Sequence, residues 1–207
     1  MAAQRYDAIV IGSGIGGGTC ARRLREGGMR VALIERERIG GETARWASIP
    51  SATVLGPSNV LWRLREAAGV KSPSMMGPGA GQGDGTPYHG DPVDHLADEA
   101  QVEHWQRQEV DVFRGAATIT SPGRVEIDGQ MLEAERIVIA TGSEPFVPGI
   151  EGLADAGYWT AREAMSFSSL PPHVVILGGG GTHAIELAQM FRMYSSEVTL
   201  VVSAERL

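Results

Sequence analysis

The sequence predicts an α/β fold in which two strand–helix–strand units stand on either side of a β meander. The first unit is indicated by apolar runs at residues 7–11 and 31–34, with a glycine cluster and an Ala/Arg/Leu-rich helical stretch between them. The second unit repeats this order, because strand-like runs at 174–177 and 198–202 flank another glycine cluster and another helical stretch. Strands that alternate with helices in this way form parallel sheets.

The segment between the two units carries the signals of antiparallel strands. Residues 110–120 and 124–127 are expected as strands of a β meander, with Asp128-Gly129 as a turn, and residues 136–140 as a further strand. Ahead of this segment the sequence predicts one helix at residues 59–68 and another at 94–108. Between them, residues 77–92 are expected to form a Gly/Pro-rich loop.

Composition and charge limit the classes of function. The 207 residues have a net charge of -7 and no dense Lys/Arg patch, which argues against a nucleic-acid or anionic-membrane surface. Neither a signal peptide nor an apolar stretch long enough to span a membrane is visible, so we expect a soluble, cytoplasmic protein that acts on small molecules. Cys20 is the only cysteine, which rules out an internal disulfide and a thiol cluster for a metal.

Gly12, Gly14 and Gly17 fit the dinucleotide-binding pattern G-x-G-x-x-G. Gly12 permits the tight turn, Gly14 lets the backbone approach a pyrophosphate, and Gly17 lets the helix pack closely on the strand. Glu35 ends the next strand, where a carboxylate can accept hydrogen bonds from ribose hydroxyls. Strand, glycines, helix and acidic residue together predict a site for the ADP half of a dinucleotide.

An apolar strand at residues 137–139 runs into Ala140, Thr141 and Gly142. This Ala-Thr-Gly ending resembles the second FAD motif of flavoproteins that have two dinucleotide-binding domains. An ordinary strand with a small-residue turn would explain these three residues by themselves, but their position between the two glycine clusters favours the flavoprotein interpretation. We therefore expect the first cofactor to be FAD.

Nearly the whole chain resembles the N-terminal half of a pyridine nucleotide-disulfide oxidoreductase, the family of dihydrolipoamide dehydrogenase, mercuric reductase and soluble transhydrogenase. Besides the motifs above, the matching residues are Gly40, Gly41, Ile49, Pro50, Ser51, Tyr158, Trp159, Thr160, Glu186, Leu187 and Ala188. The resemblance implies an FAD-type Rossmann (three-layer) domain with a β meander at 1–148, a connector at 149–172, and the truncated start of an NAD(P)-type Rossmann domain at 173–207.

The same resemblance assigns residues to the FAD site. The first glycine cluster and Glu35 share the ADP moiety with Arg36, and Gly41 and Glu42 lie beside the pyrophosphate. Ala116 offers its backbone to the adenine, and the Ala-Thr-Gly turn closes the pocket. No residue is assigned a catalytic role.

The redox segment departs from the family pattern. Relatives place two cysteines where this chain has Thr43 and Ser48, and a hydroxyl neither forms a disulfide nor attacks one as a thiolate does. Disulfide reduction by the usual route is therefore excluded. The family also has a lysine where Ala52 stands, so Glu186, which matches the partner of that lysine, has lost that partner. Either Glu186 is buried beside the flavin and its pKa is raised, or its surroundings have opened to water.

Two registers fit the second glycine cluster, as if one residue had been inserted. The register anchored on Glu186 uses Gly179, Gly181 and Ala184, and the register anchored on the strand uses Gly178, Gly180 and His183. By resemblance this turn binds the pyrophosphate of NADH or NADPH. Val202 and Ser203 at the end of the following strand provide neither an acidic residue for a free ribose nor an arginine for a 2′-phosphate, so the preference stays open.

The remaining candidate residues are given structural roles. Cys20 is expected as a core filler of the first helix, and Trp46 as a packing residue that could also lie against the flavin. His89, His95 and His104 lack the spacing of metal ligands, so no metal site is predicted.

Two functions follow from these observations. The first is an FAD-dependent NAD(P)H oxidoreductase that transfers hydride to a small-molecule, non-disulfide electron acceptor such as a quinone. The second is a non-catalytic FAD- or nucleotide-binding remnant of such an enzyme. Under either function, the chain is expected to be a truncated product or to need a partner that supplies the rest. Relatives carry a dimerisation domain after the matching region, so the oligomeric state, a homodimer included, stays open.

Overall fold

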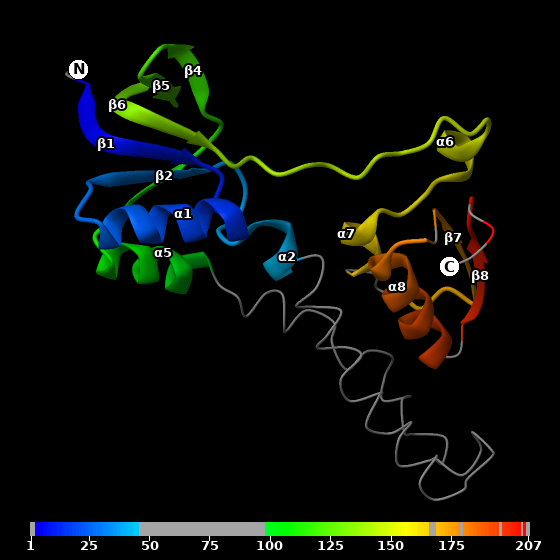
Figure 1. Ribbon diagram of the computed structural model, residues 1–207. Coiled ribbons are helices and arrows are strands. Elements are labelled where there is room, and N and C mark those ends of the chain that lie inside the picture. The colour runs from blue at the N-terminus through cyan, green and yellow to red at the C-terminus, as the bar shows by residue number, and fades with distance from the viewer. Residues whose placement is uncertain are drawn as a thin grey trace, which may run out of the picture. The chain divides into compact units, whose positions relative to one another are not determined.

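The computed structural model of the chain describes residues 3–45, 98–165, 169–178, 180–194, 196–203 and 205. Two compact units make up the chain (Figure 1). The first consists of residues 1–45 and 96–146, and the second of residues 46–95 and 147–207. The helix predicted at 59–68 and the loop predicted at 77–92 lie outside the described residues.

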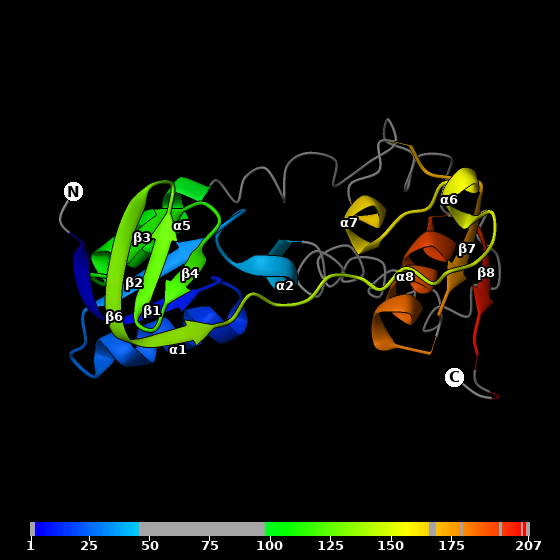
Figure 2. The same cartoon turned by 90° about the horizontal axis from the view of Figure 1, so that it is seen from above.

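The first unit, seen from above in Figure 2, is built on a six-stranded mixed sheet. The order of its strands is β3-β2-β1-β6-β5-β4. Its strands are β1 (Gln4–Ile11), β2 (Val31–Glu35), β3 (Asp111–Arg114), β4 (Thr118–Ser121), β5 (Arg124–Ile127) and β6 (Gln130–Ile139). Strands β3, β2, β1 and β6 are parallel, and β5 and β4 continue the sheet in antiparallel pairing. Ile11 of β1 is in register with Ile34 of β2 and Ile139 of β6, so these three strands end at the same level.

Helices cover one face of the parallel strands (Figure 1). The helices of this unit are α1 (Ile15–Glu26), α2 (Gly41–Arg45) and α5 (Asp98–Arg107). Val10, Val31 and Leu33 of the sheet pack with Ala21 of α1 and Trp105 of α5, and the burial of these apolar side chains stabilises the layer. The first predicted strand–helix–strand unit is confirmed, and α5 lies within the second predicted helix.

The prediction that residues 110–120 belong to the meander holds only for their last part. The first part of this segment is β3, which pairs with β2 at one edge of the sheet, and the last part is β4, which pairs with β5 at the other edge. Gly115 separates them with a φ of +134°, a conformation that glycine adopts readily and other residues do not. Because the chain turns at this glycine, β4 leaves the parallel strands instead of extending β3.

The β meander consists of β4, β5 and β6. Asp128 and Gly129 form its predicted turn with φ values of 47° and 77°, the left-handed pair that a two-residue hairpin turn requires. Ile127 of β5 belongs to the same buried cluster as Ala32 and Ile34 of β2, although β1 and β6 lie between these strands in the sheet. The sheet therefore curls, and the meander covers the face opposite α1 and α5 (Figure 1).

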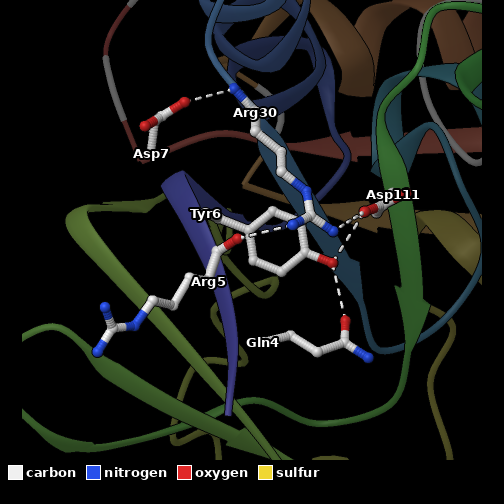
Figure 3. A network of polar contacts seen from close by, with 6 residues as sticks. All are labelled: Gln4, Arg5, Tyr6, Asp7, Arg30 and Asp111. Atoms are coloured by element: carbon white, nitrogen blue, oxygen red, sulfur yellow. Dashed lines mark hydrogen bonds and ion pairs between the residues drawn. The ribbon is translucent and has the colours of Figure 1, made fainter.

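A polar network joins β1, β3 and Arg30, the residue before β2, near the amino end of β1 (Figure 3). The buried Tyr6 hydroxyl lies 2.9 Å from Asp111 Oδ2 and 3.0 Å from Gln4 Oε1. The Arg30 guanidinium stacks over the Tyr6 ring with 4.6 Å between Cζ and the ring centroid, and its Nη2 lies 3.4 Å from Asp111 Oδ2. Asp7 accepts the backbone N–H of Arg30 at 2.7 Å. These contacts fix the start of the sheet, at the opposite end from the glycine turn.

The described residues of the second unit contain a parallel strand pair with a helix packed on it. Its described elements are α6 (Leu153–Ala156), α7 (Ala161–Ala164), β7 (His173–Leu177), α8 (Thr182–Met193) and β8 (Glu197–Val201). Leu187, Met190 and Phe191 of α8 are buried against Val174 and Val198 of the strands. The second predicted strand–helix–strand unit is thereby confirmed. In the parts of the chain that the structure describes, no helix has the length and apolar character needed to cross a membrane.

Candidate nucleotide site at the carboxyl ends of the parallel strands

Loops from distant parts of the sequence meet where β1, β2 and β6 end. Gly12, which follows β1, donates its backbone N–H to the Ile34 carbonyl of β2 at 2.8 Å. Ala140, which follows β6, donates to the Ile11 carbonyl of β1 at 2.8 Å. Strand β1 therefore has β2 on one side and β6 on the other, and such a switch point in an open parallel sheet is where ligands bind.

Gly12 and Gly17 are required by close packing. Gly12 has a φ of +101°, and a Cβ atom there would lie 2.2 Å from the Ala140 carbonyl oxygen. A Cβ atom on Gly17 would lie 1.9 Å from the Gly12 carbonyl oxygen and 3.1 Å from the Ala140 Cβ. These distances exclude any side chain, so the two glycines and Ala140 bring α1 into direct contact with the strand ends.

Gly14 faces open space and meets a second glycine. It is the N-cap of α1 and provides no side chain to cap the helix, whose first turn also lacks an acidic residue. The nearest atom to a Cβ on Gly14 would be Gly41 Cα at 4.0 Å, whereas a Cβ on Gly41 would lie only 2.7 Å from Gly14 Cα. The two backbones therefore approach closely beside an uncapped helix N-terminus, an arrangement suited to a phosphate group.

Glu35 is held at the edge of the site by hydrogen bonds. Its Oε2 accepts from the backbone N–H of Ser13 at 2.8 Å and from the Ser13 hydroxyl at 2.6 Å, and its Oε1 accepts from the Glu37 N–H at 2.9 Å. The Ser13 Oγ in turn accepts the Gly40 N–H at 3.0 Å. Sequence reasoning missed Ser13, although its place between Gly12 and Gly14 was the available signal.

The other predicted FAD-site residues of the first unit follow the same strand ends. The Arg36 guanidinium is exposed and lies 3.0 Å from Glu37 Oε1 and 3.7 Å from Glu144 Oε1. Glu42 is half-buried in the first turn of α2. Ala116 is exposed and follows Gly115, whose N–H donates to the Glu35 carbonyl at 2.9 Å; the exposed Thr141 and Gly142 follow β6. The sheet therefore brings these segments together at the carboxyl ends of its parallel strands.

Comparison with known proteins decides the family. Residues 6–207 match the family described as pyridine nucleotide-disulphide oxidoreductase. The chain belongs to this family.

Several members of the family are similar to this chain. Mercuric reductase of Staphylococcus aureus is 30% identical over 210 residues, which cover 98% of this chain and 37% of that protein. Dihydrolipoyl dehydrogenase of Bacillus subtilis is 30% identical over 227 residues, which cover 99% and 45%. The structure of the HOCl-induced flavoprotein disulfide reductase RclA from Escherichia coli has a TM-score of 0.74 at 26% identity, covering 97% of this chain and 42% of RclA. The chain thus spans less than half the length of these relatives.

The second glycine turn of this oxidoreductase-family chain begins as the first one does. Gly178 follows β7 as Gly12 follows β1, has a φ of +82°, and donates its N–H to the Val201 carbonyl of β8 at 3.0 Å. The helix, however, starts later. Gly181 is the N-cap of α8 and stands three residues after Gly178, whereas the N-cap of α1 stands two residues after Gly12.

The two glycine registers each describe one half of this longer turn. The strand-anchored register holds at Gly178, and the helix-anchored register holds at Gly181, where α8 begins. Ala184 then has the position in α8 that Gly17 has in α1, and His183 lies in the first turn of the helix. Gly179 lies outside the described residues.

Glu186 lies partly in solvent, as expected if its surroundings have opened to water after loss of the lysine. His183 Nδ1 lies 3.6 Å from Glu186 Oε2, one helical turn away, and forms an ion pair with it when the imidazole is protonated. The Glu186 side chain is 40% exposed. A carboxylate with this exposure and this neighbour is not a buried, uncompensated charge.

Little of the family's redox segment falls within the described residues. Thr43 is half-buried in α2, whereas Ser48, Ala52 and Trp46 lie outside the described residues. Cys20 is half-buried in α1. His104 of α5 is exposed, and across the described ranges no group of three or more His, Cys, Asp and Glu side chains could hold a metal ion.

Proposed function

We propose that the chain is the nucleotide-binding portion of an FAD-dependent NAD(P)H oxidoreductase whose electron acceptor is not a disulfide. The carrying observation is the uncapped N-terminus of α1 at Gly14 with Glu35 held beside it, in a chain whose only cysteine is Cys20. Residues 1–148 would form the FAD domain, 149–172 a connector, and 173–207 the start of the NAD(P) domain.

The residues of the first site fit the ADP half of FAD. The uncapped N–H groups of α1 would face the pyrophosphate, and the open space beside Gly14 would admit it. Glu35 would accept a hydrogen bond from the ribose, with Arg36 beside it. Gly41 and Glu42 would border the pyrophosphate, Ala116 the adenine, and the Ala140–Gly142 turn would close the pocket.

The second unit would hold NADH or NADPH. Gly181 leaves the N-terminus of α8 without a side-chain cap, as Gly14 does for α1, so backbone N–H groups are free to bind a pyrophosphate. Gly179 and Gly181 would line the turn. Glu186 would stand in the second turn of α8 beside His183.

The acceptor is inferred from the side chains of the redox segment. The chemistry that bound FAD supplies is acceptance of a hydride from NADH or NADPH and its delivery to a second substrate. Thr43 and Ser48 offer hydroxyls where the resemblance places redox cysteines, and neither hydroxyl exchanges with a disulfide. These hydroxyls favour a small electron acceptor such as a quinone over a disulfide.

A second candidate is a nucleotide-binding module without catalysis. The observation that favours it is the longer second glycine turn, in which Ala184 replaces the third glycine and α8 starts one residue later than α1 does. A turn of this length would place the helix N-terminus differently relative to a pyrophosphate.

One spectroscopic experiment separates the two candidates. The purified protein is mixed with FAD, freed of excess flavin by gel filtration, and titrated with NADH or NADPH without oxygen. The proposal expects retained flavin absorption that one of the nucleotides bleaches. Protein that retains no flavin overturns the proposal, and retained flavin that neither nucleotide bleaches leaves the binding module.

A further inference from the structure

We propose that Ser13 restricts Glu35 to a single ribose hydroxyl, so that the first site distinguishes the 2′-hydroxyl from the 3′-hydroxyl of its nucleotide. The inference rests on the proposed nucleotide binding and assigns to Ser13 a positioning role that acts through Glu35.

Hydrogen bonds within the protein occupy most of the acceptor positions of the Glu35 carboxylate. A carboxylate has about four acceptor positions, two on each oxygen. Oε2 already accepts the Ser13 N–H at 2.8 Å and the Ser13 hydroxyl at 2.6 Å, so both of its positions are used. Oε1 accepts the Glu37 N–H at 2.9 Å, which leaves it one position. Glu35 can therefore accept one further hydrogen bond, through Oε1.

The Ser13 hydroxyl donates its hydrogen bond to Glu35. Ser13 Oγ accepts the Gly40 N–H at 3.0 Å, so its own proton is directed to Glu35 Oε2. The chain of donors from Gly40 through Ser13 to Glu35 runs one way, and each bond strengthens the next. Ser13 is only 4% exposed, so its side chain is enclosed by protein and reaches a ligand only through the carboxylate.

The 2′- and 3′-hydroxyls of a bound ribose would compete for the one acceptor position left on Glu35. Only one of them can donate a charge-assisted hydrogen bond to Glu35, and that hydroxyl contributes more to binding than the other. Replacing Ser13 by alanine frees one acceptor position on Oε2. The carboxylate can then accept from both hydroxyls, and the difference between them shrinks.

The test compares three nucleotides by titration calorimetry. ADP, 2′-deoxy-ADP and 3′-deoxy-ADP are titrated into the full chain, the S13A and S13T variants, and the E35A variant. In the unmodified protein, one of the two deoxy analogues is expected to bind about tenfold more weakly than the other. S13T keeps the hydroxyl and the difference. S13A reduces the difference to within about threefold, and E35A removes it.

Each outcome bears on a separate claim. Equal loss of affinity for both deoxy analogues in the unmodified protein overturns the restriction to one hydroxyl. A difference that S13A leaves unchanged overturns the role of Ser13, provided that thermal unfolding shows the variant to be folded. Failure of the unmodified protein to bind ADP at all overturns the proposed function itself, and this inference with it.

Discussion

Gly16 and Gly17 are neighbours in the first turn of α1 and have opposite surroundings. A Cβ atom on Gly16 would meet nothing within 4 Å, whereas one on Gly17 would overlap the Gly12 carbonyl oxygen at 1.9 Å. We expect G17A to lower the free energy of unfolding by about 1–3 kcal/mol or more, because the helix must move off the strand ends. The matched control G16A should be neutral or stabilising by up to about 1 kcal/mol. Urea unfolding followed by circular dichroism measures both, and equal effects would contradict this role of Gly17.

Some residues of this site could be predicted from the sequence, and others could not. Gly12, Gly17 and Glu35 are predictable because their spacing along one strand–helix–strand unit has a fixed geometric meaning. Ser13 and the close approach of Gly14 to Gly41 escape such prediction, because both depend on how separate loops meet in space. Backbone contacts between distant segments leave no periodic signal in a sequence.

At the scale of elements, local patterns predicted the types of structure better than their pairing. The β4–β5–β6 meander has the predicted turn, but residues 110–120 divide between opposite edges of the sheet. Alternating apolar residues indicate a strand and do not indicate its neighbour. The division depends on Gly115, whose left-handed backbone donates to the Glu35 carbonyl of another strand.

The link between β1 and β3 predicts a pH dependence at high pH. Burial and the hydrogen bond to Asp111 raise the pKa of Tyr6 from 10.0 to about 12. Between these values the unfolded chain has lost the Tyr6 proton and the folded chain retains it, so the free energy of unfolding falls as the pH rises. This stabilisation is fully present below pH 10.0; two pKa units correspond to an upper limit of about 2.7 kcal/mol, which solvent screening reduces.

The variant Y6F removes this titration. Across the interval between pH 10.0 and about 12, urea unfolding should show a steeper loss of stability in the unmodified protein than in Y6F. Parallel slopes for the two proteins would show that the Tyr6 hydroxyl does not titrate in this network.

The N-terminus of α7 predicts a dependence at low pH. Glu163 Oε2 accepts from the Thr160 N–H at 2.6 Å and from the Thr160 hydroxyl at 2.5 Å, and the hydroxyl bond lowers the pKa of Glu163 below its ordinary value of 4.5. The stabilisation is present above the unfolded pKa of 4.5 and is lost as the pH falls through the folded pKa. T160A should cost about 1 kcal/mol near neutral pH, with T160S as control.

Hydrogen exchange of the amides in residues 161–165 measures this effect. Faster exchange in T160A than in T160S near neutral pH, with the gap closing under acid conditions, is the expected result. A gap that is the same at both pH values would mean that the Glu163 carboxylate takes no part in capping α7.

At the scale of the whole molecule, the proposed flavin would be the only redox group of this chain, because a single cysteine cannot form an internal disulfide. With Thr43 and Ser48 in place of a redox pair, one equivalent of NADH or NADPH per flavin should complete the anaerobic bleaching. C20S should give the same end point, because Cys20 has no partner thiol in its chain. An end point of two equivalents in the unmodified protein would reveal a second redox group and contradict the non-disulfide proposal.

Recognition of the ADP moiety by the first unit is the central claim, and a titration with FAD and FMN tests it most directly. The glycine turn, the N-terminus of α1 and Glu35 would contact the pyrophosphate and ribose of the ADP half, which FMN lacks. FAD should therefore bind, ADP should compete with it, and FMN should bind far more weakly. Binding of FMN as tight as that of FAD, or no competition by ADP, would contradict the claim.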